Sequence, residues 1–185
     1  MFDEPTLRLL GKWKPISSFG EADCQKAVTA FIAAIGQQPD LRAVVGDHTY
    51  NNYVPVYVYA PAEVTRHTQT DGQVRTTYPC LLFYFHHFAP IAALGRSSWG
   101  ETLRPNGTWS SQAYGALDLS GLLSLAEVQP AMHDRISTAL QRTPYSIGSP
   151  EYLRRSAPDG FGPLERSGGI LPWDRLFHLF FQFND

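Results

Sequence analysis

Apolar residues follow the period of an α-helix near the start of the chain, a shorter period in the middle, and the helical period again towards the end. The first long helical stretch is predicted at residues 19–35, where one helix face collects Cys24, Val28, Phe31, Ile32 and Ile35. Ser18 and Glu21 have the spacing of a capping box at its start, while Gly36 and Pro39 suit its end.

Residues 41–119 change to a strand pattern. The segments LRAVVGD (41–47) and YVPVYVYA (53–60) are rich in β-branched and aromatic residues. Asp71-Gly72 has the composition of a type I′ hairpin turn between two alternating segments, and Asn106-Gly107 marks a second turn. These signals predict an antiparallel meander over about 41–119.

Three further helical segments are predicted outside the meander. A short one begins at the N-cap Asp3 and ends at Gly11, and another begins after the capping box of Ser124 and Glu127 or, since proline suits a first turn, at Pro130. A single helical turn follows Ser149 and Pro150. The segment 170–183 is apolar core, and its pattern fits a helix or a strand equally well.

The order helix, sheet, helices predicts an α+β fold with an antiparallel sheet and helices packed on one face. The length of 185 residues fits a single globular domain over residues 1–185.

Composition excludes several functions. The formal net charge is -2, and no run of four basic residues occurs, so the electrostatic footprint of nucleic-acid binding is missing. The N-terminus carries acids where a signal peptide has basic residues, and no window reaches the roughly 18–20 apolar residues that span a bilayer. We therefore expect a cytoplasmic protein that binds neither nucleic acid nor membrane.

The segment YPCLLFYFHHF (78–88) ends in two adjacent histidines, His86 and His87. Neighbours on a strand point to opposite faces, so these two imidazoles cannot chelate one metal ion. The expected structure has one histidine at the edge of the core and the other in solvent. A catalytic site completed through the fold by His48 or His67 is the alternative.

Cys24 follows Asp23 near the start of the first long helix, where a helix dipole favours a thiolate nucleophile. A Cys-His hydrolase would pair it with a later histidine. However, Cys24 lies on the apolar stripe of that helix, so we expect it in the core. GRSSWG (95–100) departs from the G-x-S-x-G spacing of a nucleophile elbow, and no phosphate-binding glycine loop occurs. No cofactor and no metal are expected.

Alternation along YVPVYVY places Val54, Val56 and Val58 on one face of a strand, and Tyr53, Tyr57 and Tyr59 on the other. Pro55 favours an edge strand. Tyrosine is enriched at protein interfaces, so this row is the predicted partner-binding site. The alternative is that helices or loops cover it.

Two functional hypotheses follow. The first is a non-enzymatic protein-binding domain, of which a cytoplasmic immunity protein that neutralises a toxin by direct binding is one form. The second is a small hydrolase that uses Cys24, or His86 or His87 with His48. Each candidate set of catalytic residues fails a test of spacing or burial, and this favours the protein-binding hypothesis.

Overall fold

The computed structural model describes residues 2–12, 14–16, 18–47, 51–158 and 175–181. Its helices are α1 (Glu4–Leu10), α2 (Glu21–Gly36), α3 (Pro130–Leu140), α4 (Pro150–Leu153) and α5 (Leu176–Phe180), with single 3-10 turns at Pro61–Glu63 and Leu125–Glu127. Its strands are β1 (Arg42–Val45), β2 (Tyr53–Tyr59), β3 (Thr65–Thr68), β4 (Val74–His86), β5 (Ile91–Leu103), β6 (Trp109–Tyr114) and β7 (Ser146–Ile147).

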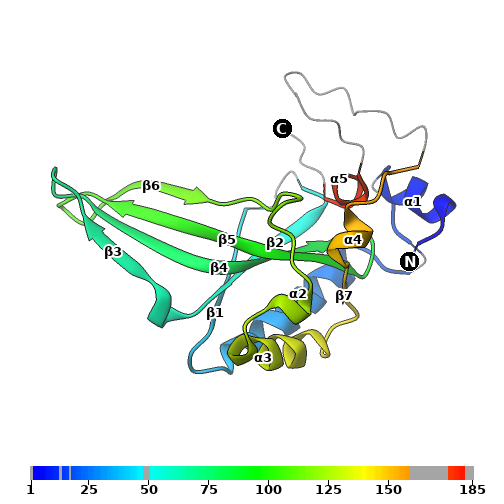
Figure 1. The fold of residues 1–185 in the computed structure, drawn as a ribbon, viewed down its shortest axis with the longest axis horizontal. Helices are drawn as coiled ribbons and strands as arrows, with labels where there is room; N and C mark the ends of the chain where they lie inside the picture. The colour runs from blue at the N-terminus through cyan, green and yellow to red at the C-terminus, as the bar shows by residue number, and fades with distance from the viewer. Residues whose placement is uncertain (1, 13, 17, 48–50, 159–174, 182–185) are drawn as a thin grey trace, which may run out of the picture.

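The predicted α+β class and antiparallel meander are confirmed. Strands pair in the order β1-β2-β4-β5-β6, β3 pairs with the first part of β4, and the two-residue β7 adds to β5 in parallel. β4 and β5 are 13 residues each, far longer than their neighbours. The sheet therefore has two parts along their length (Figure 1).

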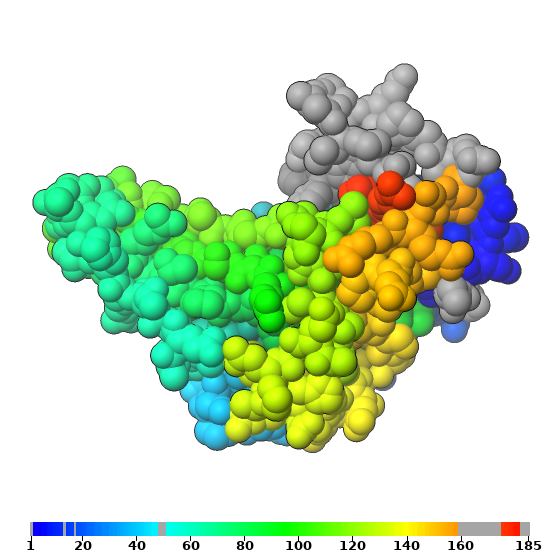
Figure 2. Space-filling view, viewed as in Figure 1, coloured from blue at the N-terminus to red at the C-terminus, as the bar shows by residue number. Residues whose placement is uncertain are grey.

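We call the first part the inner half. It contains β1, β2, β7, residues 81–86 of β4 and residues 91–96 of β5. The second part is the arm, which contains β3, β6, residues 74–80 of β4 and residues 97–103 of β5. The arm projects beyond the helices (Figures 1 and 2).

Both hairpin turns of the arm lie where the sequence predicts, although their geometry differs from type I′. The Gly72 amide donates to the Gln69 carbonyl, and the Gly107 amide donates to the Arg104 carbonyl, so each glycine follows the two central residues of its turn. Gly72 and Gly107 have φ of 80° and 79°. This left-handed position after a tight turn is accessible to glycine without strain.

Helix α2 begins two residues later than predicted, with Gly20 as its N-cap. The Asp23 carboxylate accepts from the Gly20 amide at 3.0 Å, which replaces the predicted contact between Ser18 and Glu21. The other helix starts agree with the sequence: Asp3 caps α1 by accepting from the Thr6 amide, and α3 begins at Pro130.

One face of the inner half packs against α2 and α3, as predicted for a sheet with helices on one face. Phe31 from α2 meets Phe83 and Phe85 from β4 at ring-centroid distances of 5.2 and 5.1 Å. All three rings are fully buried. Each buried phenylalanine contributes about 1.5–3 kcal/mol to folding, so this cluster anchors the helical layer.

The opposite face of the inner half is also covered, which the sequence analysis gave as the alternative to an exposed tyrosine row. The short helices α1, α4 and α5 pack there, and their buried residues Leu10, Leu153 and Phe180 join Tyr53 and Tyr84 of the sheet. The described part of the segment 170–183 is helical, as α5. The run LLFYFH (81–86) is apolar without a period because this part of β4 is buried on both faces.

Pro55 lies in an internal strand and not at the sheet edge, since β2 pairs with both β1 and β4. The last β1–β2 pair is Val45 with Val56, so Pro55 comes just past it. The Gly46 amide donates to the Pro55 carbonyl, which places the proline nitrogen on the β1 side of the strand, where β1 ends. The missing N–H therefore costs the sheet little. Among the described residues, no helix has the length and apolar composition required to cross a bilayer.

Candidate binding surface

Four aromatic side chains form a continuous row across one face of the arm. Tyr78, Trp99 and Tyr114 are direct cross-strand partners on β4, β5 and β6, and Tyr59 at the end of β2 joins them. The rings of Tyr78 and Trp99 are stacked with centroids 3.8 Å apart and planes 4° from parallel. Tyr114 lies 5.8 Å from Trp99 on the other side, and Tyr59 lies 5.2 Å from Tyr78.

A β-bulge adds Trp109 to the same face. The register shifts between Thr102 and Leu103, so that Leu103 pairs with Trp109 while Trp99 pairs with Tyr114. Trp109 and Tyr114 are five residues apart and would otherwise point to opposite faces. Both side chains are largely in solvent, at 55% and 42% exposure. We call Tyr59, Tyr78, Trp99, Trp109 and Tyr114 together the aromatic face.

Polar groups between these rings are already oriented. The Tyr78 hydroxyl donates to Glu101 Oε1 at 2.7 Å. Burial and this carboxylate raise the pKa of Tyr78 to about 12, so the hydroxyl stays protonated. The indole nitrogen Nε1 of Trp99 is buried and has no acceptor among the described residues. A buried donor without a partner costs about 1–3 kcal/mol.

The reverse face of the arm has a different chemistry. A trough there is lined mainly by small or polar residues, namely Gln69, Arg75, Thr77, Ser98, Gly100, Thr102, Ser111, Ala113 and Gly115. Trp99 and Tyr114 also border it, although strand alternation places their side chains on the aromatic face. No helix of the described residues covers either face of the arm, so the contrast comes from the strands themselves. The aromatic residues are thus confined to one face.

The predicted tyrosine row divides between core and surface. Tyr53 and Tyr57 are buried, at 1% and 4% exposure, because α5 and the segment after β6 cover them. The Tyr57 hydroxyl donates to the Gly115 carbonyl at 2.9 Å. Only Tyr59 remains half-buried at the surface, where it belongs to the aromatic face. Tyr53 and Tyr57 therefore cannot contact a partner in this conformation.

His86 is fully buried among the aromatic rings of Phe88, Phe180 and Phe181. Its Nδ1 atom accepts from the Phe88 amide at 3.0 Å, and its Nε2 atom lies 3.4 Å from Asn52 Nδ2. Burial, and the neighbouring His87, lower the pKa of His86 to about 3. This imidazole is a neutral part of the core near pH 7 and cannot accept a substrate proton.

His87 points to the other face of the sheet, as predicted, but it is buried and not in solvent. Its Nδ1 lies 3.6 Å from Glu21 Oε1 at the start of α2, and its amide donates to the Asn52 carbonyl. The start of α2 lies over the end of β4, which the sequence could not show.

Within the described residues, His67 does not complete a site with this pair. His67 is exposed on β3 opposite Arg75, eleven residues along β4 from His86, or roughly 35 Å. His48 lies outside the described residues. In the part of the chain that the structure describes, no three His, Cys, Asp or Glu side chains converge to hold a metal ion.

Cys24 is fully buried against the sheet, where its Sγ lies 3.9 Å from the Phe85 carbonyl. Burial raises the pKa of this thiol to about 11, despite the neighbouring Tyr145 hydroxyl. A nucleophilic cysteine needs the opposite shift and an open approach. Cys24 is therefore a core residue, as its place on the apolar stripe indicates.

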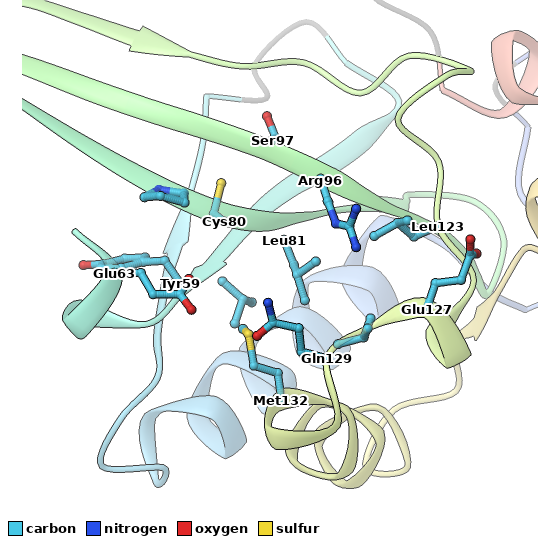
Figure 3. Close-up of a pocket in the computed structure, with 13 residues that line it drawn as sticks. Tyr59, Glu63, Cys80, Leu81, Arg96, Ser97, Leu123, Glu127, Gln129 and Met132 are labelled. Atoms are coloured by element: carbon cyan, nitrogen blue, oxygen red, sulfur yellow. The ribbon is translucent and has the colours of Figure 1, made fainter. Parts of the chain in front are cut away.

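A small pocket lies where the arm joins the inner half (Figure 3). Its floor is apolar, with Leu81 and Leu123 facing Met132 of α3, and Arg96 reaches in from β5. Cys80 and Ser97 point to the other side of the sheet. The pocket volume of about 200 Å³ is below the roughly 300–1,000 Å³ of typical ligand sites, so it fits a single side chain better than a substrate.

Sequence reasoning missed Tyr78, Trp99, Trp109 and Tyr114, although a signal for three of them exists. Trp99 and Tyr114 are equally far from the Asn106-Gly107 turn, and Tyr78 and Trp99 are equally far from the turn at Phe88 and Ala89. Counting outward from each turn gives the cross-strand partners. The bulge that turns Trp109 to this face left no such signal.

No protein-family model matches this chain, and no curated protein or solved structure is significantly similar to it. The surface chemistry of the described residues is therefore the basis for a functional proposal.

Proposed function

We propose that this chain is a non-enzymatic protein-binding domain and that the aromatic face of the arm contacts the partner. The carrying observation is the gathering of Tyr59, Tyr78, Trp99, Trp109 and Tyr114 on one uncovered sheet face. Tyrosine and tryptophan dominate the binding energy of protein interfaces, because they bury a large area while losing little side-chain entropy.

The ring orientation favours a protein over a carbohydrate. Sugar rings stack on the flat faces of exposed aromatic side chains. Here Trp99 is only 7% exposed, and its two faces are covered by Tyr78 and Tyr114. The surface presents ring edges, hydroxyl groups and the largely exposed Trp109, a mixture typical of protein interfaces.

Toxin neutralisation in the cytoplasm is a narrower form of this proposal. Its support is the size of the chain and its slightly acidic charge of -2. The hydrolase alternative has no favourable geometry, since Cys24 and His86 are both fully buried. Binding without catalysis is thus the function that the described residues support best.

Affinity capture from a lysate of the source cells, read by mass spectrometry, tests the proposal. Three baits would be compared in separate experiments: the wild-type chain, the double variant Trp109→Ala/Tyr114→Ala, and the control variant Leu9→Ala. Leu9 on α1 is 43% exposed, close to Tyr114 at 42%, but lies far from the arm. A specific partner should bind wild type and the control equally, and bind the double variant at least about tenfold more weakly.

A captured partner that binds all three baits equally would remove the aromatic face from the proposal. Circular dichroism of each bait confirms that the exposed substitutions leave the fold intact. If the captured partner is a toxin, addition of the chain should abolish its activity at equal stoichiometry, which distinguishes the narrower form from other binding functions.

A further inference from the structure

The sheet has four edge strands in its described part, β1, β3, β6 and β7, and they differ in how they are protected. β7 is only two residues long, which by itself limits pairing with another chain. β1 carries Arg42, and β3 carries Arg66 and His67. Charged side chains on an edge strand discourage pairing with another chain. β6 (WSSQAY) has none, and the stretch from Thr108 to Leu117 contains no charged residue and no proline.

The backbone of β6 has free hydrogen-bonding groups on its outer side. The Gly115 amide donates to the Ser98 carbonyl of β5, which fixes the alternation along the strand. Ser111 and Ala113 also point to β5, so Gln112 and Tyr114 direct their amides and carbonyls away from the sheet. No other described strand pairs with β6 there.

We propose that β6 pairs with β6 of a second copy of this chain, in antiparallel orientation about a two-fold axis through Gln112. Only residues whose backbone amide and carbonyl point away from β5 can bond to the second copy. Gln112 therefore pairs with Gln112 of the second copy, and Tyr114 pairs with Ser110 of the second copy. This pairing supplies about six backbone hydrogen bonds. The inference does not depend on the proposed partner of the aromatic face.

Two features of β6 suit a second copy. A two-fold interface brings the same surface of both copies together. A charged residue near the axis would therefore lie close to the identical charge of the second copy and be repelled. β6 carries no charged residue, so this repulsion does not arise. The axis stands perpendicular to the sheet, so the aromatic faces of both copies become continuous. Trp109, turned to this face by the bulge, then lies beside Tyr114 of the second copy.

Sedimentation velocity of the full chain, from about 1 μM to about 100 μM, tests this pairing, because a single-strand interface is small and therefore weak. The wild-type mass should rise towards that of a dimer across this range. Gln112→Lys places two ammonium groups on the axis and should hold the chain monomeric. The control Thr68→Lys adds the same charge to the exposed strand β3 and should dimerise as wild type does.

Disulfide trapping tests the register. Gln112 and its copy would have Cα atoms about 5.5 Å apart, within the range of a disulfide. Oxidised glutathione should therefore convert Gln112→Cys to a covalent dimer and leave Thr68→Cys monomeric, since the native Cys24 and Cys80 are buried. A wild type that stays monomeric, a Gln112→Lys variant that still dimerises, or equal trapping of both cysteine variants would each overturn the proposal.

Discussion

The two parts of the sheet share strands β4 and β5 but differ in nearly every other respect. In the inner half both faces are buried under helices, and β4 residues 81–86 are all buried. In the arm, burial along the same strand alternates, because the side chains on the aromatic face are more buried than those on the reverse face, and no helix of the described residues covers either face. Stability is therefore concentrated in the inner half, and surface chemistry is concentrated in the arm.

The largest expected contrast is in core deletion. Phe83→Ala removes a fully buried ring that packs against Phe31 and Phe85, and it should lower the free energy of unfolding by about 3–5 kcal/mol. Thr77→Ala, in the arm on the same strand, should change it by less than about 0.5 kcal/mol. Urea unfolding measures the change in the free energy of unfolding for both variants. Equal losses would show that the arm is as tightly packed as the inner half.

The second contrast is in pH dependence. His86 stays neutral in the folded state down to about pH 3, whereas in the unfolded chain it takes up a proton below about pH 6.5. Stability should therefore be complete above pH 6.5 and fall as the pH is lowered, by up to about 1.4 kcal/mol per pH unit.

Between pH 6.5 and 5 this predicts a loss of about 2 kcal/mol, before most carboxylates titrate. His86→Gln should lower stability at pH 7 and flatten this slope. Chemical denaturation at several pH values measures the slope. An unchanged slope in His86→Gln would assign the proton uptake to another group.

A smaller effect is expected where the two parts meet. Tyr57→Phe removes the hydroxyl that donates to the Gly115 carbonyl and should cost about 0.5–1.5 kcal/mol, because that hydrogen bond is part-buried. For the half-exposed Tyr59, the change Tyr59→Phe should cost less than about 0.5 kcal/mol. Thermal unfolding compares the two, and the reverse order would contradict the division of the tyrosine row between core and surface.

The smallest effect on stability is expected at the tip of the aromatic face. Trp109→Ala removes a side chain that is 55% exposed, so the free energy of unfolding should change by no more than about 0.5 kcal/mol. The same variant should weaken partner binding clearly. A large loss of stability would instead show that Trp109 supports the fold of the arm.

The elements of the fold were predictable because their signals are local. Gly72 and Gly107 mark both hairpins, Asp3 and Pro130 mark helix starts, and the spacing of Cys24 to Ile35 gives the face of α2. Each depends on backbone preferences or on periodicity within one segment. The α+β class then follows from the order of the elements.

The candidate site was less predictable because it depends on contacts between distant segments. Whether Tyr57 is core or surface is decided by which segments cover it, and those lie some sixty residues or more further along the chain. Likewise, His87 is buried because the start of α2 lies over it. Alternation along a strand gives the face of each side chain but not what covers that face.

The bulge in β6 separates two properties of the arm. Removing Ser110 would bring Trp109 and Tyr114 to an even spacing of four and leave both opposite Leu103 and Trp99, so the composition of the aromatic face would survive. The strand would lose only its local bend and extra twist. The side chains thus decide the chemistry that this surface presents, and one additional residue in the backbone decides how strongly the surface curves.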